Sequence, residues 1–192
     1  METSYAHGNP NIVVILQDLN VMQDGTFKNT RLFAGTYEIW PFETCGYPCT
    51  EETQKTIVSN GGKTTKVEFT IIPYLILKWV RELYQDTDNY IKASFKFKRN
   101  AKEGVDMPDV YKAKLLILTT MRCVENSDGR YTDNDLTITN DQEGEIVELK
   151  LKDKIWFTQK IGVKVGTKCG DTYKKYSFTD IETLEAQGFG CD

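Results

Sequence analysis

The stretch Tyr90-Ile-Lys-Ala-Ser-Phe-Lys-Phe-Lys98 decides the predicted fold. Its apolar residues, Ile91, Ala93, Phe95 and Phe97, alternate with polar ones. Successive side chains of a β-strand point to opposite faces, so this alternation is typical of a strand with one face buried and one in water. The stretch therefore predicts a sheet whose core contains the two phenylalanines and whose lysines face outward.

Other segments repeat this signal along the chain. Residues 65–71, 147–151 and 157–165 alternate in the same way, and 31–40 is a further predicted strand. Two runs, 12–16 and 115–118, are apolar throughout and are predicted to be strands covered on both sides. Glycine and asparagine occur in the connections between the predicted strands, as is typical of turns. Residues 136–151 have the pattern of a hairpin with a short loop. Hairpins in series favour an antiparallel meander.

One segment, residues 73–86, has a helical pattern instead. Pro73 suits the first turn of a helix, and at about 100° per residue the apolar side chains form two stripes. The broad stripe contains Ile72, Leu75, Ile76, Trp79, Val80 and Leu83, and the second contains Tyr74, Leu77 and Tyr84 beside Arg81. A helix on its own sheet needs only one such stripe, so the second favours contact with another layer or another subunit. A shorter helix is predicted over residues 180–187.

The predicted fold class is mainly β, a β-rich α+β protein. We expect an antiparallel β-sandwich or barrel with one packed amphipathic helix at about 73–86 and a short C-terminal helix. The length of 192 residues suits a single β-rich domain, 1–192. This domain has an extended leader at about 1–10 and long hairpin loops at about 122–145.

Composition argues against several classes of protein. No apolar run approaches the roughly 18 residues that span a membrane, and the first residues lack the pattern of a secretory signal. The net charge of −4 argues against nonspecific nucleic-acid binding. The expected location is the virion if the protein is viral, and otherwise the cytoplasm.

Catalytic chemistry has little support in the sequence. The single histidine, His7, lies in the polar leader, which disfavours a histidine-based triad, and no glycine-rich phosphate loop is present. Glu38 and Glu43 flank Trp40, but two solvated glutamates at a strand end are the favoured interpretation. We predict no enzyme activity and no cofactor.

The cysteines give no clear site either. Cys45, Cys49, Cys123, Cys169 and Cys191 are an odd number, so reduced thiols are the default expectation. The three residues between Cys45 and Cys49 do not match a thioredoxin-type motif, and the other cysteines lack metal-knuckle spacing. We predict no metal site, while disulfide pairing and zinc binding stay open as alternatives.

Charge is distributed unevenly. Residues 124–145 contain seven acidic residues against one arginine, whereas residues 90–102 contain five basic residues and no acid. Such patches at opposite ends of a domain would favour head-to-tail association into rings or tubes.

The first hypothesis is therefore a structural assembly protein that forms a homo-oligomeric ring, tube or shell. The order of elements resembles, at the level of architecture, the small β-barrel proteins of tailed-phage tails and necks, which implies a virion component. Its partners would be copies of itself and neighbouring structural proteins, with no membrane and no sequence-specific nucleic acid. The predicted subunit interface contains Tyr74, Leu77, Arg81, Tyr84, Lys92, Lys96, Lys98, Asp133 and Asp135.

The alternative hypothesis is a β-sandwich module that binds carbohydrate or a cell surface. Aromatic residues gather around one strand end, where their flat faces could stack on pyranose rings. The predicted platform contains Tyr37, Trp40, Phe42 and Tyr47. Contact with another subunit would explain the same aromatics equally well.

Overall fold

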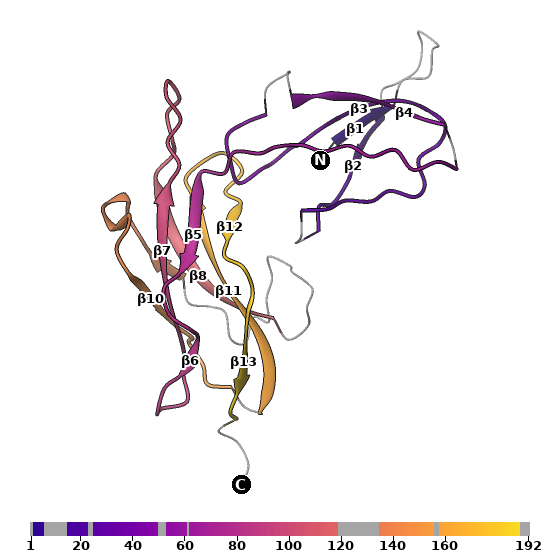
Figure 1. Ribbon diagram of the computed structural model, residues 1–192. Helices are drawn as coiled ribbons and strands as arrows, with labels where there is room; N and C mark the ends of the chain where they lie inside the picture. Colours follow the sequence, from indigo (N-terminus) through magenta and orange to yellow (C-terminus); the bar gives the residue numbers. More distant parts are fainter. Residues whose placement is uncertain are drawn as a thin grey trace. The chain divides into compact units, whose positions relative to one another are not determined.

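The computed structural model describes residues 2–5, 15–22, 25–49, 53–60, 62–118, 135–155 and 158–188. The chain divides into two compact units, Met1–Ile72 and Pro73–Asp192. Both are built from antiparallel sheets (Figure 1). Whether the two units fold together as the single domain expected from the sequence stays a prediction.

The N-terminal unit contains one four-stranded sheet in the order β2-β1-β3-β4. Its strands are β1 (Glu2–Tyr5), β2 (Ile15–Asp18), β3 (Gly35–Trp40) and β4 (Lys55–Ser59). The expected leader thus supplies an interior strand, because β1 pairs with both β2 and β3. Tyr37 and Ile39 of β3 are buried, and the Tyr37 hydroxyl donates a hydrogen bond of 2.9 Å to the Phe33 carbonyl.

The C-terminal unit contains two sheets. In the first, β7 pairs with β10, β5 and β6; in the second, β11 pairs with β8, β12 and β13, and β8 pairs with β9. The strands are β5 (Leu75–Trp79), β6 (Tyr84–Gln85), β7 (Ile91–Arg99), β8 (Val110–Leu118), β9 (Asp135–Thr137), β10 (Val147–Lys150), β11 (Gln159–Cys169), β12 (Tyr176–Phe178) and β13 (Glu182–Ala186).

The core of this unit lies between its two sheets, which face one another (Figure 1). Phe95 and Phe97 of β7 are 0% and 1% exposed, which confirms the interpretation of the alternating stretch. Residues 115–118 of β8 are buried on both sides of their sheet, as their continuous apolar run predicts. Apolar burial of this kind contributes roughly 1.5–3 kcal/mol per large side chain.

No α-helix forms in the described part of the chain, so the prediction of a packed helix at 73–86 is wrong. Residues 75–79 form β5, in which Leu75, Leu77 and Trp79 lie opposite Arg99, Phe97 and Phe95 of β7. The spacing of apolar residues there fits the period of a strand as well as that of a helix. Pairing with β5 satisfies backbone groups of β7 that would otherwise lie at an open sheet edge. The C-terminal helix is also wrong, because Glu182–Ala186 is strand β13.

The expected hairpin over residues 136–151 is not formed. Its two strands belong to different sheets, since β9 pairs with β8 and β10 pairs with β7. A short 3-10 helix, Asn140–Gln142, lies between them. No helix in the described residues is long and apolar enough to cross a membrane.

Thr179 joins the two strands that share one edge of β11. β12 pairs with Gly166–Lys168 and β13 pairs with Gln159–Val163, which leaves Lys164 and Val165 between them. The Val165 amide donates to the Thr179 hydroxyl oxygen at 3.0 Å, and the Thr179 amide donates to the Val165 carbonyl at 2.9 Å. The buried threonine hydroxyl thus replaces a backbone acceptor in the ladder.

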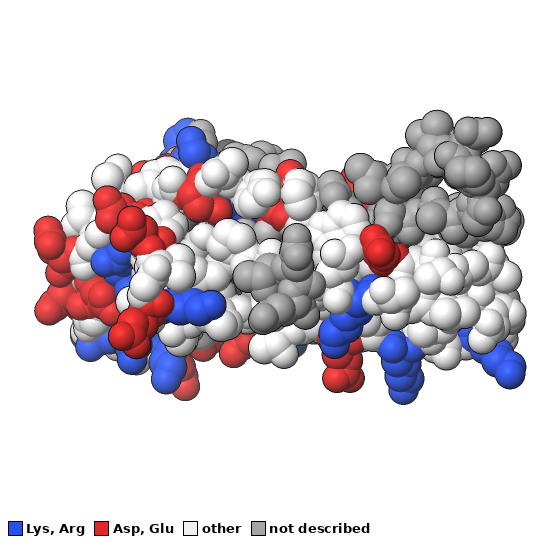
Figure 2. Space-filling model, turned by 90° about the horizontal axis from the view of Figure 1, so that it is seen from above, with Lys and Arg blue, Asp and Glu red and all other residues white. Residues whose placement is uncertain are grey.

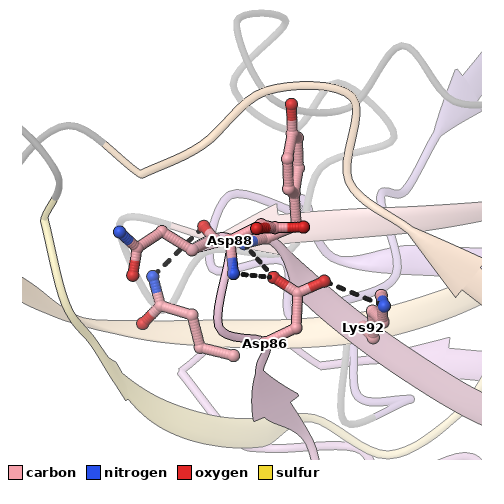
Figure 3. Close-up of polar contacts among 6 residues, drawn as sticks. Asp86, Asp88 and Lys92 are labelled. Carbon is pink, nitrogen blue, oxygen red and sulfur yellow. Dashed lines mark hydrogen bonds and ion pairs between the residues drawn. The ribbon is translucent and has the colours of Figure 1, made fainter.

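Asp86 organises the turn between β6 and β7, where a helix end was expected. Its Oδ1 accepts the amides of Asp88 and Tyr90 at 3.0 and 2.9 Å, and its Oδ2 lies 2.8 Å from the Lys92 ammonium (Figure 3). The hydrogen bond from Lys92, followed by that from Tyr90, lowers the pKa of Asp86 below its usual value. Asn89 takes a positive φ of 67° in this turn, as asparagine tolerates.

Replacing Thr179 by valine tests the ladder contact. Thr179→Val keeps the side-chain volume but leaves the buried Val165 amide without its acceptor, so we expect a loss of about 1–3 kcal/mol in the free energy of unfolding. Urea denaturation measures it. Thr183→Val, at an exposed position of β13, is the matched control and should change stability little. Equal stability of both variants would contradict the role assigned to the hydroxyl.

Replacing Asp86 by asparagine tests the turn through its pH dependence. A lowered pKa means that the ionised carboxylate stabilises the fold above the unfolded-state pKa of about 3.9, and that this contribution disappears as the pH falls through the folded-state value. Asp86→Asn should therefore be less stable than the wild type at neutral pH, with the difference shrinking in acid. Urea midpoints measured across this pH range check it. Asp88→Asn is the control, and a difference independent of pH would count against the ion pair.

Candidate functional site

The outward face of β3 and β4 carries one aromatic side chain among polar ones. Along β3, Glu38 and Trp40 alternate with the buried Tyr37 and Ile39, so they share the opposite face of the sheet. In the register of the two strands, Glu38 lies directly opposite Thr56. A half-buried indole, a carboxylate and a hydroxyl are thereby placed on one surface of the N-terminal unit.

Gln54 fixes the acid on this face. Its Nε2 donates a hydrogen bond of 3.0 Å to Oε2 of Glu38 across the two strands. A carboxylate has about four acceptor positions, so one such bond orients Glu38 and leaves acceptor capacity for a ligand. The amide oxygen of Gln54 adds a further acceptor.

A groove of about 390 Å³ runs along the neighbouring edge of the sheet. It lies between β4 and residues 66–68 and is lined by Lys55, Thr56, Ile57, Lys66, Val67 and Glu68. The Lys55 ammonium reaches across to the Glu68 carbonyl at 2.5 Å. Because Thr56 belongs to both the groove and the face of Trp40, the two surfaces are continuous.

This surface can hold a ligand that has both a flat apolar side and many hydroxyl groups. The indole offers an apolar face, while the carboxylate, amide and hydroxyl groups on the same face offer acceptors and donors. Such a combination of one aromatic and several polar groups is typical of sites that fix orientation by hydrogen bonds.

The structure keeps only part of the aromatic platform predicted from sequence. Phe42 is 38% exposed and Trp40 is half-buried, but Tyr37 and Tyr47 are 3% and 6% exposed and belong to the core. Two of the four rings therefore cannot stack on a ligand. The sequence analysis missed Gln54 and Thr56, although the β-branched run from Thr56 to Val58 is a strand signal that could have placed them.

The residues of the predicted subunit interface do not all lie on one surface. Tyr74 is 7% exposed and lies in the core, which removes it from any outer surface. Leu77 and Lys92 are half-buried; Arg81, Tyr84, Lys96, Lys98 and Asp135 are exposed. Asp133 lies outside the described residues.

Within the described residues, acidic and basic side chains lie close together in the C-terminal unit, and a hydrogen bond joins the acidic segment to the basic one. The Arg99 amide donates to Oε1 of Glu143 at 2.9 Å, and the Arg99 guanidinium lies 4.0 Å from Asp109. A further ion pair joins Lys112 and Asp135. Figure 2 shows Lys and Arg side chains beside Asp and Glu side chains at the left end of the view. Residues 119–134, with three of the seven acidic residues of that segment, lie outside the described part of the chain, so the expected charge separation stays a prediction.

A second aromatic pair lies on β12, with a lysine of β11 over each ring, and Phe178 is 37% exposed. Tyr176 and Phe178 stack at a centroid distance of 5.6 Å. The ammonium groups of Lys168 and Lys164 lie 4.0 and 3.5 Å from the centroids of Tyr176 and Phe178, respectively. A Cβ at Gly166 would lie 2.9 Å from atoms of both rings, so the rings occupy the space above this glycine. The pair is therefore a packing element and a poor stacking platform.

The cysteines form no recognisable site in the described residues. Cys45, Cys49 and Cys169 form no disulfide with one another there, and no cluster of three potential metal ligands occurs in the same part of the chain. Cys123 and Cys191 lie outside it.

Comparison with known proteins gives a fold but no family. No protein-family model matches the sequence, and no curated protein does. Among solved structures, a DUF3823 family protein from Bacteroides uniformis is similar with a TM-score of 0.74 and 17% identity over 96% of this chain and 88% of the other. A DUF3823 family protein from Bacteroides ovatus gives 0.63 and 15% over 96% and 88%. A "putative carbohydrate binding protein" from Bacteroides uniformis gives 0.66 and 14% over 96% and 87%.

These structures correct the first hypothesis from sequence. They share the β-rich fold over nearly the whole chain and are Bacteroides proteins, so the prediction of a virion component of the phage tail or neck type is wrong. At these identities the likeness concerns the fold alone.

Proposed function

We propose that this chain is a non-enzymatic carbohydrate-binding module, and that the outward face of β3 and β4 is its binding surface. The observation that carries the proposal is the placement of Trp40 beside a carboxylate that Gln54 holds in position. The description of one structure of the same fold as a "putative carbohydrate binding protein" supports it.

The geometry assigns a separate task to each group. The indole of Trp40 stacks on the C–H face of a pyranose ring, while Glu38 accepts hydrogen bonds from hydroxyl groups at the ring's edge. Thr56 extends the polar contacts toward the groove, where Lys55 and Glu68 flank a space suited to a second sugar unit. The ligand is thus an oligosaccharide that lies across β4.

The proposal involves no bond-breaking step. Binding requires only an aromatic face and hydrogen-bonding groups, whereas glycoside hydrolysis requires two carboxyl groups placed on either side of the scissile bond. We assign Glu38 to binding because it is held by a neutral amide on the exposed face of the sheet.

Substitution of the indole tests this function. Trp40→Ala should weaken the binding of an array-selected neutral oligosaccharide by about tenfold or more, because loss of about 1.4 kcal/mol of stacking corresponds to a factor of ten. Glu38→Gln should weaken it as well, since hydrogen bonds to charged groups are stronger than neutral ones. Titration calorimetry on the full chain measures both.

Phe33→Ala is the matched control for this test. Phe33 is 79% exposed in the same unit, so its removal tests loss of an aromatic surface in general. Unchanged affinity for Phe33→Ala with reduced affinity for Trp40→Ala supports the assignment. Equal affinities for Trp40→Ala and the wild type, or no oligosaccharide bound by the wild type, would overturn it.

A further inference from the structure

The outer face of the β10-β7-β5 sheet is strongly cationic. Phe95, Phe97 and their neighbours point into the core, so the alternate positions of these strands point outward. From the register, the outward charged residues are Lys78, Lys92, Lys96, Lys98, Lys150 and Glu148. Five lysines against one glutamate stand out in a chain whose net charge is −4.

The register places lysines directly opposite one another twice. Lys78 of β5 faces Lys96 of β7, and Lys150 of β10 faces Lys92 of β7. Side chains in such positions have Cβ atoms about 4.5–5.5 Å apart, and like charges there oppose folding. The face therefore carries an arrangement that strand pairing alone would disfavour.

Nearby acids neutralise this face only in part. Asp86 pairs with Lys92, and the Glu148 carboxylate lies 4.0 Å from Arg81. Within the part of the chain that the structure describes, Lys78, Lys96 and Lys98 have no ion-pair partner, and all three are exposed. These three lysines lie on β5 and on the C-terminal half of β7, where the Glu143 carboxylate accepts the amide of the neighbouring Arg99.

Protection of a sheet edge explains only part of this distribution. Lysines that prevent edge-to-edge association belong on edge strands, as Lys78 on β5 and Lys150 on β10 do. Lys92 instead lies on β7 between β10 and β6, while Lys96 and Lys98 pair with β5 beyond the last residue that pairs with β10. The three lysines of β7 form a line about 20 Å long, given the rise of about 3.3 Å per residue, and the neighbouring strands widen it with Lys150 and Lys78.

We propose that this face, the lysine stripe of β7 with Lys78 and Lys150, binds an acidic polysaccharide. A linear polymer with carboxylate or sulfate groups at regular intervals matches a linear row of ammonium groups, which act as point charges for anions. The stripe lies on a different unit from Trp40, and this inference does not depend on the neutral-sugar site.

The test uses the full chain and three soluble probes: dextran sulfate, polygalacturonate and neutral dextran. Affinity electrophoresis at low ionic strength should show retardation by at least one of the two acidic polymers and none by neutral dextran, and added salt should abolish it. The double variant Lys78→Glu/Lys96→Glu should lose at least tenfold in affinity. Lys28→Glu/Lys63→Glu, an equal charge change at exposed positions of the N-terminal unit, should lose less than twofold.

A stability measurement separates loss of binding from loss of structure. Lys78→Glu converts a like-charge pair into an attractive pair with Lys96, so its thermal midpoint should equal or exceed that of the wild type while polyanion binding falls. Unchanged binding by the double variant would overturn the proposal, as would an equal loss in the control. Preferential binding of phosphatidylserine vesicles or duplex DNA over both polymers would overturn it too. Failure of the Trp40 test would leave these results unaffected.

Discussion

The pairing of β11 with three other strands is the constraint on which the C-terminal unit depends. Over its eleven residues β11 pairs with β8 along one edge and with β12 and β13 along the other. Its inward side chains Ile161, Val163 and Val165 are at most 1% exposed. Where neither β12 nor β13 pairs with β11, the Thr179 hydroxyl accepts the Val165 amide. The lack of a side chain at Gly166 leaves space for the rings of Tyr176 and Phe178. Buried backbone groups must be paired, which explains why a hydroxyl fills the gap.

The same requirement explains the failed helix prediction. The segment 73–86 has spacing that fits a helix as well as a strand, and its intrinsic helical preference is a weak prior that tertiary contacts override. Where this segment pairs with β7, Leu77 lies opposite Phe97 and Trp79 lies opposite Phe95. The turn at Asp86 then leads the chain into β7. The Asp86 carboxylate supplies the acceptor that the backbone amides of this turn need.

Function is assigned to the outer faces of the two units, where side chains are under the least packing constraint. In the N-terminal unit, one side of β3 packs the core and the other side displays Trp40 and Glu38. In the C-terminal unit, β7 buries its phenylalanines and displays its lysines. The two faces differ in chemistry: one combines an aromatic ring with hydrogen-bonding groups, while the other carries positive charge at a cost to strand pairing. Neither face contributes much to the core, so each can vary without changing the fold.

The sequence by itself determined the mainly β character, the burial of Phe95 and Phe97 and the covered run at 115–118. These features follow from the spacing of apolar residues within a single strand, which does not depend on the strands it pairs with. Only the tertiary structure decided that 73–86 and 182–186 are strands, that β9 and β10 belong to different sheets, and that Tyr37 and Tyr47 are core residues. It also decided which lysines face one another and that Gln54 holds Glu38. Those outcomes depend on the register between strands distant in sequence, and a one-residue change in register would move each side chain to the other face.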